Sequence, residues 1–165
     1  MNSFNNREVL RAIIKGDINS LREYFSSGLS SGSLTEKEGW NLLHQATILV
    51  GKPANVNSVE FLLKNGVSAN VQDMYGNIPL HYSARNNDIA TVQLLIDFNS
   101  EVNVLNHDGV SPLHQALLNA NINIELVQLL LSHGASTKLG GVTEFSKSIN
   151  NSAVNEVFRQ YGIKA

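Results

Sequence analysis

The stretch Gly-Val-Ser-Pro-Leu-His-Gln-Ala at residues 109–116 decides the fold, because related stretches occur twice earlier in the chain. They are Gly-Asn-Ile-Pro-Leu-His-Tyr-Ser-Ala at 76–84 and Gly-Trp-Asn-Leu-Leu-His-Gln-Ala at 39–46. The histidines at positions 44, 81 and 114 are separated by 37 and 33 residues. Self-similarity at such a period indicates a stack of similar supersecondary units.

A second amphipathic stretch follows each of these segments, at residues 59–66, 92–99 and 127–134. Its apolar residues recur at helical spacing, so each repeat is expected to contain two helices. Proline is tolerated in the first turn of a helix, where its missing N–H has no intrahelical partner, and Ser111 can cap the helix that starts at Pro112. Gly66 and Gly134 stand where a second helix ends and a left-handed residue is favoured, and Asn99 takes that place in the middle repeat.

Together the two motifs resemble the ankyrin repeat, which has a period of about 33 residues and the signature Thr-Pro-Leu-His-x-Ala. The resemblance continues in weaker form at both ends, where terminal repeats lack a neighbour and are atypical. It implies an all-α ankyrin-repeat solenoid of about five stacked helix-turn-helix repeats, with β-turn or hairpin fingers and atypical caps. A single domain, 1–165, is expected, with repeats at about 5–34, 35–71, 72–104, 105–137 and 138–165.

Composition excludes several classes of protein. The chain is 42% hydrophobic and 16% charged, which is too apolar for a disordered chain, and no apolar run reaches the roughly 20 residues of a membrane span. No cationic segment followed by an apolar stretch opens the chain, so no secretory signal is expected. It contains no cysteine, which excludes disulfides and thiolate sites. We expect a cytoplasmic protein.

Charge argues against nucleic acid and membrane surfaces as partners. The net charge is -2 and the isoelectric point is near 6.2, and Lys and Arg are scattered singly, so there is no basic patch. The expected partner is another protein, and nothing in the sequence requires a homodimer, so the chain is expected to be a monomer by itself.

The repeats differ in length between their two helices. Gly39 to Gly66 is 27 residues and Gly109 to Gly134 is 25, whereas Gly76 to Asn99 is 23. The extra residues are expected at 51–55 and 119–123. Such insertions form loops on one side of a solenoid and can belong to a binding surface; plain length variation is the alternative that we favour.

The regular histidines are not expected to bind a metal. Packed helices lie about 8–10 Å apart, whereas zinc requires nitrogen ligands at about 2.0–2.1 Å from one point. The resemblance implies instead that His44, His81 and His114 are structural and that their rings bond to backbone at repeat junctions. His107 and His133 are expected to be solvated.

No catalytic site or cofactor is expected. Phosphate-binding loops, nucleophile elbows and the metalloprotease helix motif are all missing from the sequence. The acidic residues between repeats are interpreted as turn-forming and solvated, which leaves no paired carboxylates for acid–base chemistry. These residues are Glu36, Glu38, Asp73 and Asp108.

The resemblance places the binding surface on the turn fingers and on the exposed side of the first helices, which line a concave face. Trp40, Tyr75 and Arg85 belong to the residue types that dominate interface hot spots, although Trp40 has the alternative of folding back over the turn around Leu34. Apolar residues at 48, 49 and 118 occupy positions that are usually polar in the family. The expected partner-binding residues are Lys37, Glu38, Trp40, Ile48, Leu49, Met74, Tyr75, Asn77, Arg85, Asn86, His107, Asp108, Val110, Leu118 and Asn119.

Three hypotheses about function follow. The first is a protein-binding module that inhibits one partner by occluding it, and its specific form is an immunity-type protein that neutralises a bacterial toxin. The second is an adaptor or host-directed effector that bridges proteins and therefore needs two separable faces. The third is an enzyme with a site in one of the inserted loops, lined by residues 50–57 or 119–124.

Overall fold

The computed structural model describes residues 6–163 of the chain. Within this range it contains α-helices and one short 3-10 helix, η1, and no β-strand. The outermost residues of the first and last expected repeats, residue 5 and residues 164–165, lie outside the described part. The helices are α1 (Asn6–Lys15), α2 (Ile18–Ser26), α3 (Leu42–Thr47), α4 (Val56–Lys64), α5 (Pro79–Arg85), α6 (Ile89–Asp97), α7 (Pro112–Leu117), α8 (Ile124–Ser132), η1 (Leu139–Gly141), α9 (Val142–Ile149) and α10 (Ser152–Gln160).

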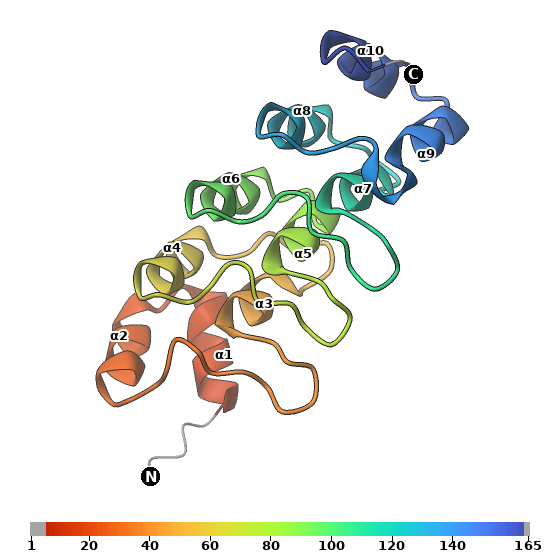
Figure 1. Cartoon of the computed structure of the whole chain (residues 1–165). Helices are drawn as coiled ribbons and strands as arrows, with labels where there is room; N and C mark the ends of the chain where they lie inside the picture. The colour runs from red at the N-terminus through yellow and green to blue at the C-terminus, as the bar shows by residue number, and fades with distance from the viewer. Residues whose placement is uncertain (1–5, 164–165) are drawn as a thin grey trace.

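The helices form two parallel rows (Figure 1). The inner row is α1, α3, α5, α7 and α9, and the outer row is α2, α4, α6, α8 and α10. Each helix packs against its counterparts in the neighbouring repeats, as α3 does against α1 and α5. Long loops before α3, α5 and α7 all project from the inner row in one direction. The expected all-α solenoid of stacked helix pairs is confirmed.

Local sequence explains where the helices begin and end. Asn41 and Ser111 cap α3 and α7, and proline opens α5 and α7. Every outer helix begins after an Asp or Asn whose side chain accepts a backbone N–H, as Asp88 does from Thr91 in α6. The residues after the outer helices adopt left-handed conformations, with φ of 80° at Gly66, 62° at Asn99 and 83° at Gly134, as predicted.

A continuous hydrophobic core runs between the two rows. Leucines at equivalent places in successive repeats are fully buried, among them Leu43, Leu80 and Leu113 on the inner row and Leu62 and Leu95 on the outer row. Each such side chain contributes about 1.5–3 kcal/mol relative to an exposed one. Because every repeat buries its neighbour's apolar face, the stability of this core depends on stacking.

The inserted residues do lie between the helices of a pair, and each loop is hydrogen-bonded to a neighbouring repeat, the first to the following repeat and the later one to the preceding repeat. Gly51 N–H donates to Asn86 Oδ1 at 3.1 Å, and Ala54 N–H donates to Asp88 Oδ2 at 2.7 Å. In the later loop the Asn121 carbonyl accepts from Asn87 Nδ2 at 3.1 Å. These bonds give both loops a structural role. No helix in the described part of the chain is long and apolar enough to cross a membrane.

Candidate functional site

Three fingers, formed by residues 35–41, 72–78 and 105–111, each close on a side-chain oxygen. Asp73 Oδ1 accepts the backbone N–H groups of Tyr75 and Asn77, both at 2.9 Å. Asn106 Oδ1 forms the same turn in the third finger, and Thr35 Oγ1 accepts Trp40 N–H at 3.0 Å in the first. Short polar side chains that bond nearby backbone are what such turns require.

Backbone hydrogen bonds connect each finger to the next. Met74 N–H donates to the Glu38 carbonyl at 2.8 Å, and His107 N–H donates to the Tyr75 carbonyl at 2.9 Å. Gly76 has φ of 77°, and a Cβ there would lie 2.8 Å from His107 Cδ2 and 2.9 Å from His107 N. The close approach of the fingers therefore depends on a residue without a side chain.

The expectation that the acidic residues between repeats are solvated is wrong for Asp73. It does form a turn, but it is only 5% exposed and is not solvated. Its Oδ2 accepts Trp40 Nε1–H at 3.2 Å and the Tyr82 hydroxyl at 2.5 Å, so the carboxylate is satisfied by four donors from three segments. Burial, followed by the bond to this carboxylate, raises the pKa of Tyr82 above its usual value.

Two of the three regular histidines join one repeat to the next, as predicted. His44 Nε2–H donates to the Asn77 carbonyl at 3.0 Å, and His81 Nε2–H donates to the Val110 carbonyl at 3.0 Å. Their Nδ1 atoms accept backbone N–H groups within their own repeats. Burial lowers the pKa of both rings, that of His81 to about 4, so both are neutral at pH 7.

His114 departs from this pattern. Its Nδ1 is buried without a hydrogen-bond partner, and its ring lies 4.8 Å from the ring of Phe145. At the place of the next finger the chain forms the short η1 helix, in which Gly140 lies against the Gly109 carbonyl. The expected structural bond to the next repeat is therefore not formed at this junction, where an aromatic contact takes its place.

The expected partner-binding residues divide by exposure. One group is exposed and free to contact another molecule: Lys37, Leu49, Met74, Tyr75, His107, Asp108 and Leu118. The other group is half-buried: Glu38, Trp40, Ile48, Asn77, Arg85, Asn86, Val110 and Asn119. All of them belong to the fingers or to the inner helices and the residues that directly follow these helices, and we call the surface formed by these segments the finger–helix face.

Several half-buried members hold the repeats together. Arg85 Nη2 donates to the Ile48 carbonyl at 2.9 Å, and its guanidinium lies 4.9 Å from the centre of the Tyr82 ring. Asn86 Nδ2 donates to the Thr47 carbonyl at 2.8 Å, and Asn119 Nδ2 donates to Ala84 O at 3.3 Å. Substitution of these side chains would change stability as well as any contact with a partner.

One further exposed apolar residue occupies the equivalent position in the first repeat. Ile14 of α1 is 45% exposed and lies three residues before the cap of its outer helix, Asp17, as Arg85 lies before Asp88. Ile48 and Leu118 are the residues that directly follow α3 and α7. Ile14 could have been found by aligning the two capping aspartates, but the missing Pro-Leu-His in the first repeat conceals this register.

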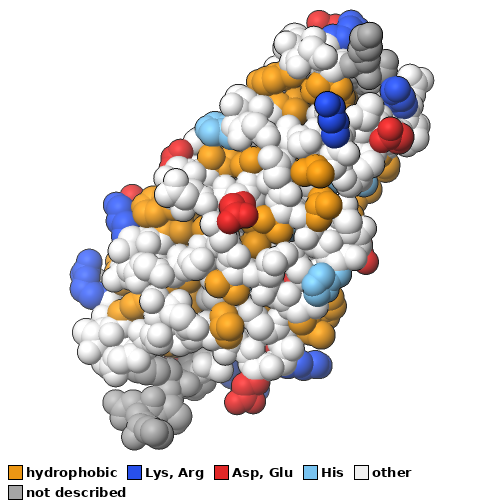
Figure 2. Space-filling view, in the orientation of Figure 1, with side chains coloured by type: hydrophobic (Ala, Val, Ile, Leu, Met, Phe, Trp, Pro, Cys, Tyr) orange, Lys and Arg blue, Asp and Glu red, His pale blue; other side chains and the backbone are white. Residues whose placement is uncertain are grey.

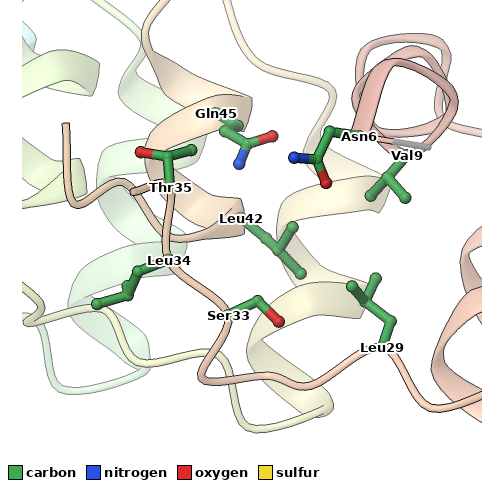
Figure 3. A pocket seen from close by; sticks show the side chains of 8 residues that line it. All are labelled: Asn6, Val9, Leu29, Ser33, Leu34, Thr35, Leu42 and Gln45. Atoms are coloured by element: carbon green, nitrogen blue, oxygen red, sulfur yellow. The ribbon is translucent and has the colours of Figure 1, made fainter. Parts of the chain in front are cut away.

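Two hollows adjoin the first finger. The first, which we call the Leu42 hollow, has a volume of about 230 Å³. Apolar and polar side chains line it in equal number (Figure 3): Val9, Leu29, Leu34 and Leu42, and Asn6, Ser33, Thr35 and Gln45. The second, which we call the Trp40 hollow, lies on the finger–helix face and also has a volume of about 230 Å³. Its apolar walls are Leu10, Trp40 and Ile48, and Arg7 and Glu38 also line it.

The position of Trp40 decides between its two expected placements. Its indole N–H is directed to Asp73 in the next finger, and its ring contributes to the Trp40 hollow. The alternative, in which it folds back over the turn around Leu34, is therefore wrong; Leu34 itself is 53% exposed. One side of the indole stabilises the stack, and the other is available on the finger–helix face.

Charged side chains are dispersed over the molecule. The face drawn in Figure 2 shows Lys, Arg, Asp and Glu as isolated spots between hydrophobic and uncharged polar side chains. Within residues 6–163, no group of three His, Asp or Glu side chains is placed to hold a metal ion. The arrangement suits shape-dependent contacts with a protein surface.

Comparison with known proteins agrees with this architecture. A family model described as ankyrin repeats in three copies matches residues 3–104 and also residues 43–140. An ankyrin repeat protein of Rickettsia felis is 29% identical over 137 residues, which are 82% of this chain and 43% of that protein. One from Fowlpox virus is 34% identical over 82 residues, 49% of this chain and 24% of its own length.

A human protein matches this chain over a smaller fraction of its own length. The SMC5-SMC6 complex localization factor protein 1 of Homo sapiens is 36% identical over 110 residues, which are 64% of this chain and 10% of that protein. The chain spans less than half the length of each of these three relatives.

Proposed function

The chain belongs to the ankyrin repeat family, and from that premise we propose that it binds another protein through the finger–helix face and inhibits it by occlusion. Ankyrin repeats are protein-interaction modules, and they are in general not enzymes. The inhibitory outcome, the identity of the partner as a cognate toxin and the monomeric, cytoplasmic state of the chain belong to this proposal.

One observation carries the choice of surface. Large apolar or aromatic side chains stand exposed along it, with 49% exposure at Met74, 52% at Tyr75 and 47% at Leu118. Single exposed apolar residues are common on any protein, but these lie on the same face as the Trp40 hollow. A surface of this kind loses unfavourable contact with water when a partner covers it.

Rigidity favours inhibition over loose association. The fingers are fixed by their own turns and by backbone bonds to each other, so few groups must be ordered when a partner binds. Binding by a pre-organised surface avoids an entropic cost of about 0.5–1.5 kcal/mol for each side chain that would otherwise be immobilised.

The inserted loops offer little support for the enzymatic alternative. Residues 50–57 contain one titratable side chain, Lys52, and residues 119–124 contain none. General acid–base chemistry requires positioned titratable groups. The loops are instead occupied in bonds to the neighbouring repeat.

An adaptor remains the second candidate because of a groove on the opposite row. The groove lies between α6 and α8, has a volume of about 450 Å³ and is lined in part by Ile89, Leu129 and Tyr161. A bridging protein would use this groove and the finger–helix face at the same time, whereas an inhibitor requires only the latter.

Affinity capture from a lysate of the source cells tests the proposal. A variant with Met74→Glu and Leu118→Glu places carboxylates on the finger–helix face, and the matched control carries Asn19→Glu and Asn57→Glu on the exposed side of the outer helices α2 and α4. We expect one protein to be retained in equimolar amount by the wild type and the control and to be lost by the first variant. The activity of that protein, assayed with and without an equimolar amount of the chain, distinguishes an inhibitor from an adaptor. Retention by the first variant alone would contradict the assignment of the face.

A further inference from the structure

We propose that the Trp40 hollow binds one large apolar side chain from a peptide segment that carries an acidic residue beside it. The inference rests on the proposed function, because it states the chemistry of a segment that the finger–helix face binds. It concerns the N-terminal part of that face, where α1, the first finger and α3 meet.

The size of the hollow fits a side chain. Its volume of about 230 Å³ is below the roughly 300–1,000 Å³ of sites that enclose small-molecule ligands. Its walls come from three segments, with Leu10 on α1, Trp40 on the finger and Ile48 at the end of α3. These segments are packed together by the core, so the hollow exists before any ligand arrives.

The indole of Trp40 offers no hydrogen-bond donor to a ligand in the hollow. The Trp40 N–H already donates to Asp73 Oδ2 at 3.2 Å, and Asp73 is buried behind it. The exposed part of the ring is therefore purely apolar. A polar side chain entering the hollow would lose water without gaining a bond from the indole, whereas a leucine or phenylalanine would gain apolar contact.

Charges around the hollow select the flanking residues. Arg7 lines it on the α1 side, and Arg85 bonds the carbonyl of Ile48 on the α5 side. Guanidinium groups stay protonated at all physiological pH values. Glu38 lies at the finger edge, so partner carboxylates are favoured toward the helices. Charge complementarity therefore favours an acidic residue beside the apolar one, on the side that faces the helices.

A fluorescence titration tests this inference with three capped synthetic peptides of equal length. One has a central leucine between pairs of glutamates, one has the same leucine between pairs of lysines, and one has a central glycine between glutamates. Trp40 is the only tryptophan, so its emission reports on the hollow. We expect saturable binding of the first peptide, on the order of tenfold tighter than either of the others. Equal or tighter binding of the lysine peptide, or no saturable change with any peptide, would overturn the proposal.

Two matched pairs of variants locate the binding. Ile48→Glu places a carboxylate in the hollow and should weaken the glutamate–leucine peptide on the order of tenfold. Val56→Glu, at an exposed apolar position at the start of the outer helix α4, should leave its affinity unchanged. Arg7→Gln should weaken it several-fold, about fivefold, whereas Arg11→Gln, which lines a different hollow on α1, should have no effect. Equal effects within either pair would contradict the assignment.

The outcome is separable from that of the proposed function. If the peptides fail but cellular capture still depends on Met74 and Leu118, then the chain binds a partner through this face and the inference about the hollow is wrong. If the peptides bind as expected but capture does not depend on those two residues, then the hollow is a site and the wider face assignment is wrong.

Discussion

Trp40 Nε1 lies 3.2 Å from Asp73 Oδ2, so the first finger is tied to the second by a carboxylate that is buried between them. The same oxygen accepts the Tyr82 hydroxyl, and the other carboxylate oxygen closes the turn of the second finger. One side chain therefore sets the shape of a finger and also its distance from the preceding finger and from α5.

Replacement of Asp73 is expected to be costly. Asp73→Ala removes the acceptor of four hydrogen bonds and leaves the Trp40 and Tyr82 donors unpaired in a buried site. A loss of about 2–4 kcal/mol in the free energy of unfolding is expected. Urea unfolding followed by the emission of Trp40 measures it.

Asp73→Asn is the control for this prediction. Asn106 shows that an asparagine forms the same turn in the third finger, so the turn should survive and only the bonds to Oδ2 should be impaired. The loss should be smaller than for Asp73→Ala. Equal losses in the two variants would show that the turn itself contributes little.

Glycine at position 76 is expected to be required for finger packing. Gly76 and Gly109 occupy equivalent turns with φ of 77° and 72°, but of the two only Gly76 has neighbours within 4 Å of the place that a Cβ would occupy, the nearest at 2.8 Å. Alanine at either position carries the conformational cost of about 1 kcal/mol for a left-handed residue. Gly76→Ala should lose about 1–2 kcal/mol more, because the added methyl displaces His107.

The difference in stability between Gly76→Ala and Gly109→Ala measures the cost of separating the fingers. Thermal or urea unfolding of both proteins measures the difference directly, because the backbone cost is common to them. Equal stabilities would indicate that the fingers separate without penalty, and that the contact between positions 76 and 107 does not stabilise the stack.

The free energy of unfolding should decrease as the pH falls below about 6.5, the pKa of histidine in the unfolded chain. Burial lowers the pKa of His81 to about 4 and also lowers the pKa of His44, whereas in the unfolded chain both titrate near about 6.5. Between these values the unfolded state binds more protons than the folded state, so the free energy of unfolding decreases with decreasing pH. For His81 the slope is at most about 1.36 kcal/mol per pH unit, and the total is about 3 kcal/mol by pH 4.

Urea midpoints between pH 7.5 and pH 5 test this prediction before the carboxylates begin to titrate. His81→Gln keeps a donor for the Val110 carbonyl but has no ionisable ring, so its midpoint should depend less on pH than that of the wild type. An identical pH dependence in both proteins would assign the effect to other groups.

Much of the fold follows from local signals in the sequence. Proline at helix starts, Ser111 as a cap and left-handed residues such as Gly66 act within one or two turns of chain, and the structure confirms each of them. The burial of Asp73 has no such local signal, because it depends on Trp40, which lies 33 residues earlier. A contact between repeats also explains why Arg85 is half-buried. From the sequence we expected an exposed arginine, whereas in the structure its guanidinium donates to the Ile48 carbonyl.

The candidate site is harder to predict than the fold for the same reason. Residue type alone selects Trp40, Tyr75 and Arg85 as contact residues, yet only Tyr75 of these is more than half exposed. Whether a large side chain on this face contacts solvent or the adjacent repeat is decided by its neighbours in space. Ile14 shows the converse, since its exposure depends on a register that the first repeat hardly displays.

Two of the regular histidines, His81 and His114, should respond differently to the same substitution. His81→Leu removes the partner of two buried backbone groups, the Ile78 N–H and the Val110 carbonyl, and is expected to cost about 2–4 kcal/mol. His114 Nδ1 has no partner and its ring already packs on Phe145, so His114→Leu replaces an unsatisfied polar ring with an apolar side chain. Its effect should lie within about 1 kcal/mol of zero. Urea unfolding of both variants at pH 7.5 gives the comparison. Comparable losses would mean that His114 has a bonding role at its junction after all, whereas a loss confined to His81→Leu would show that the histidine stabilises a repeat only where the next finger offers it a carbonyl.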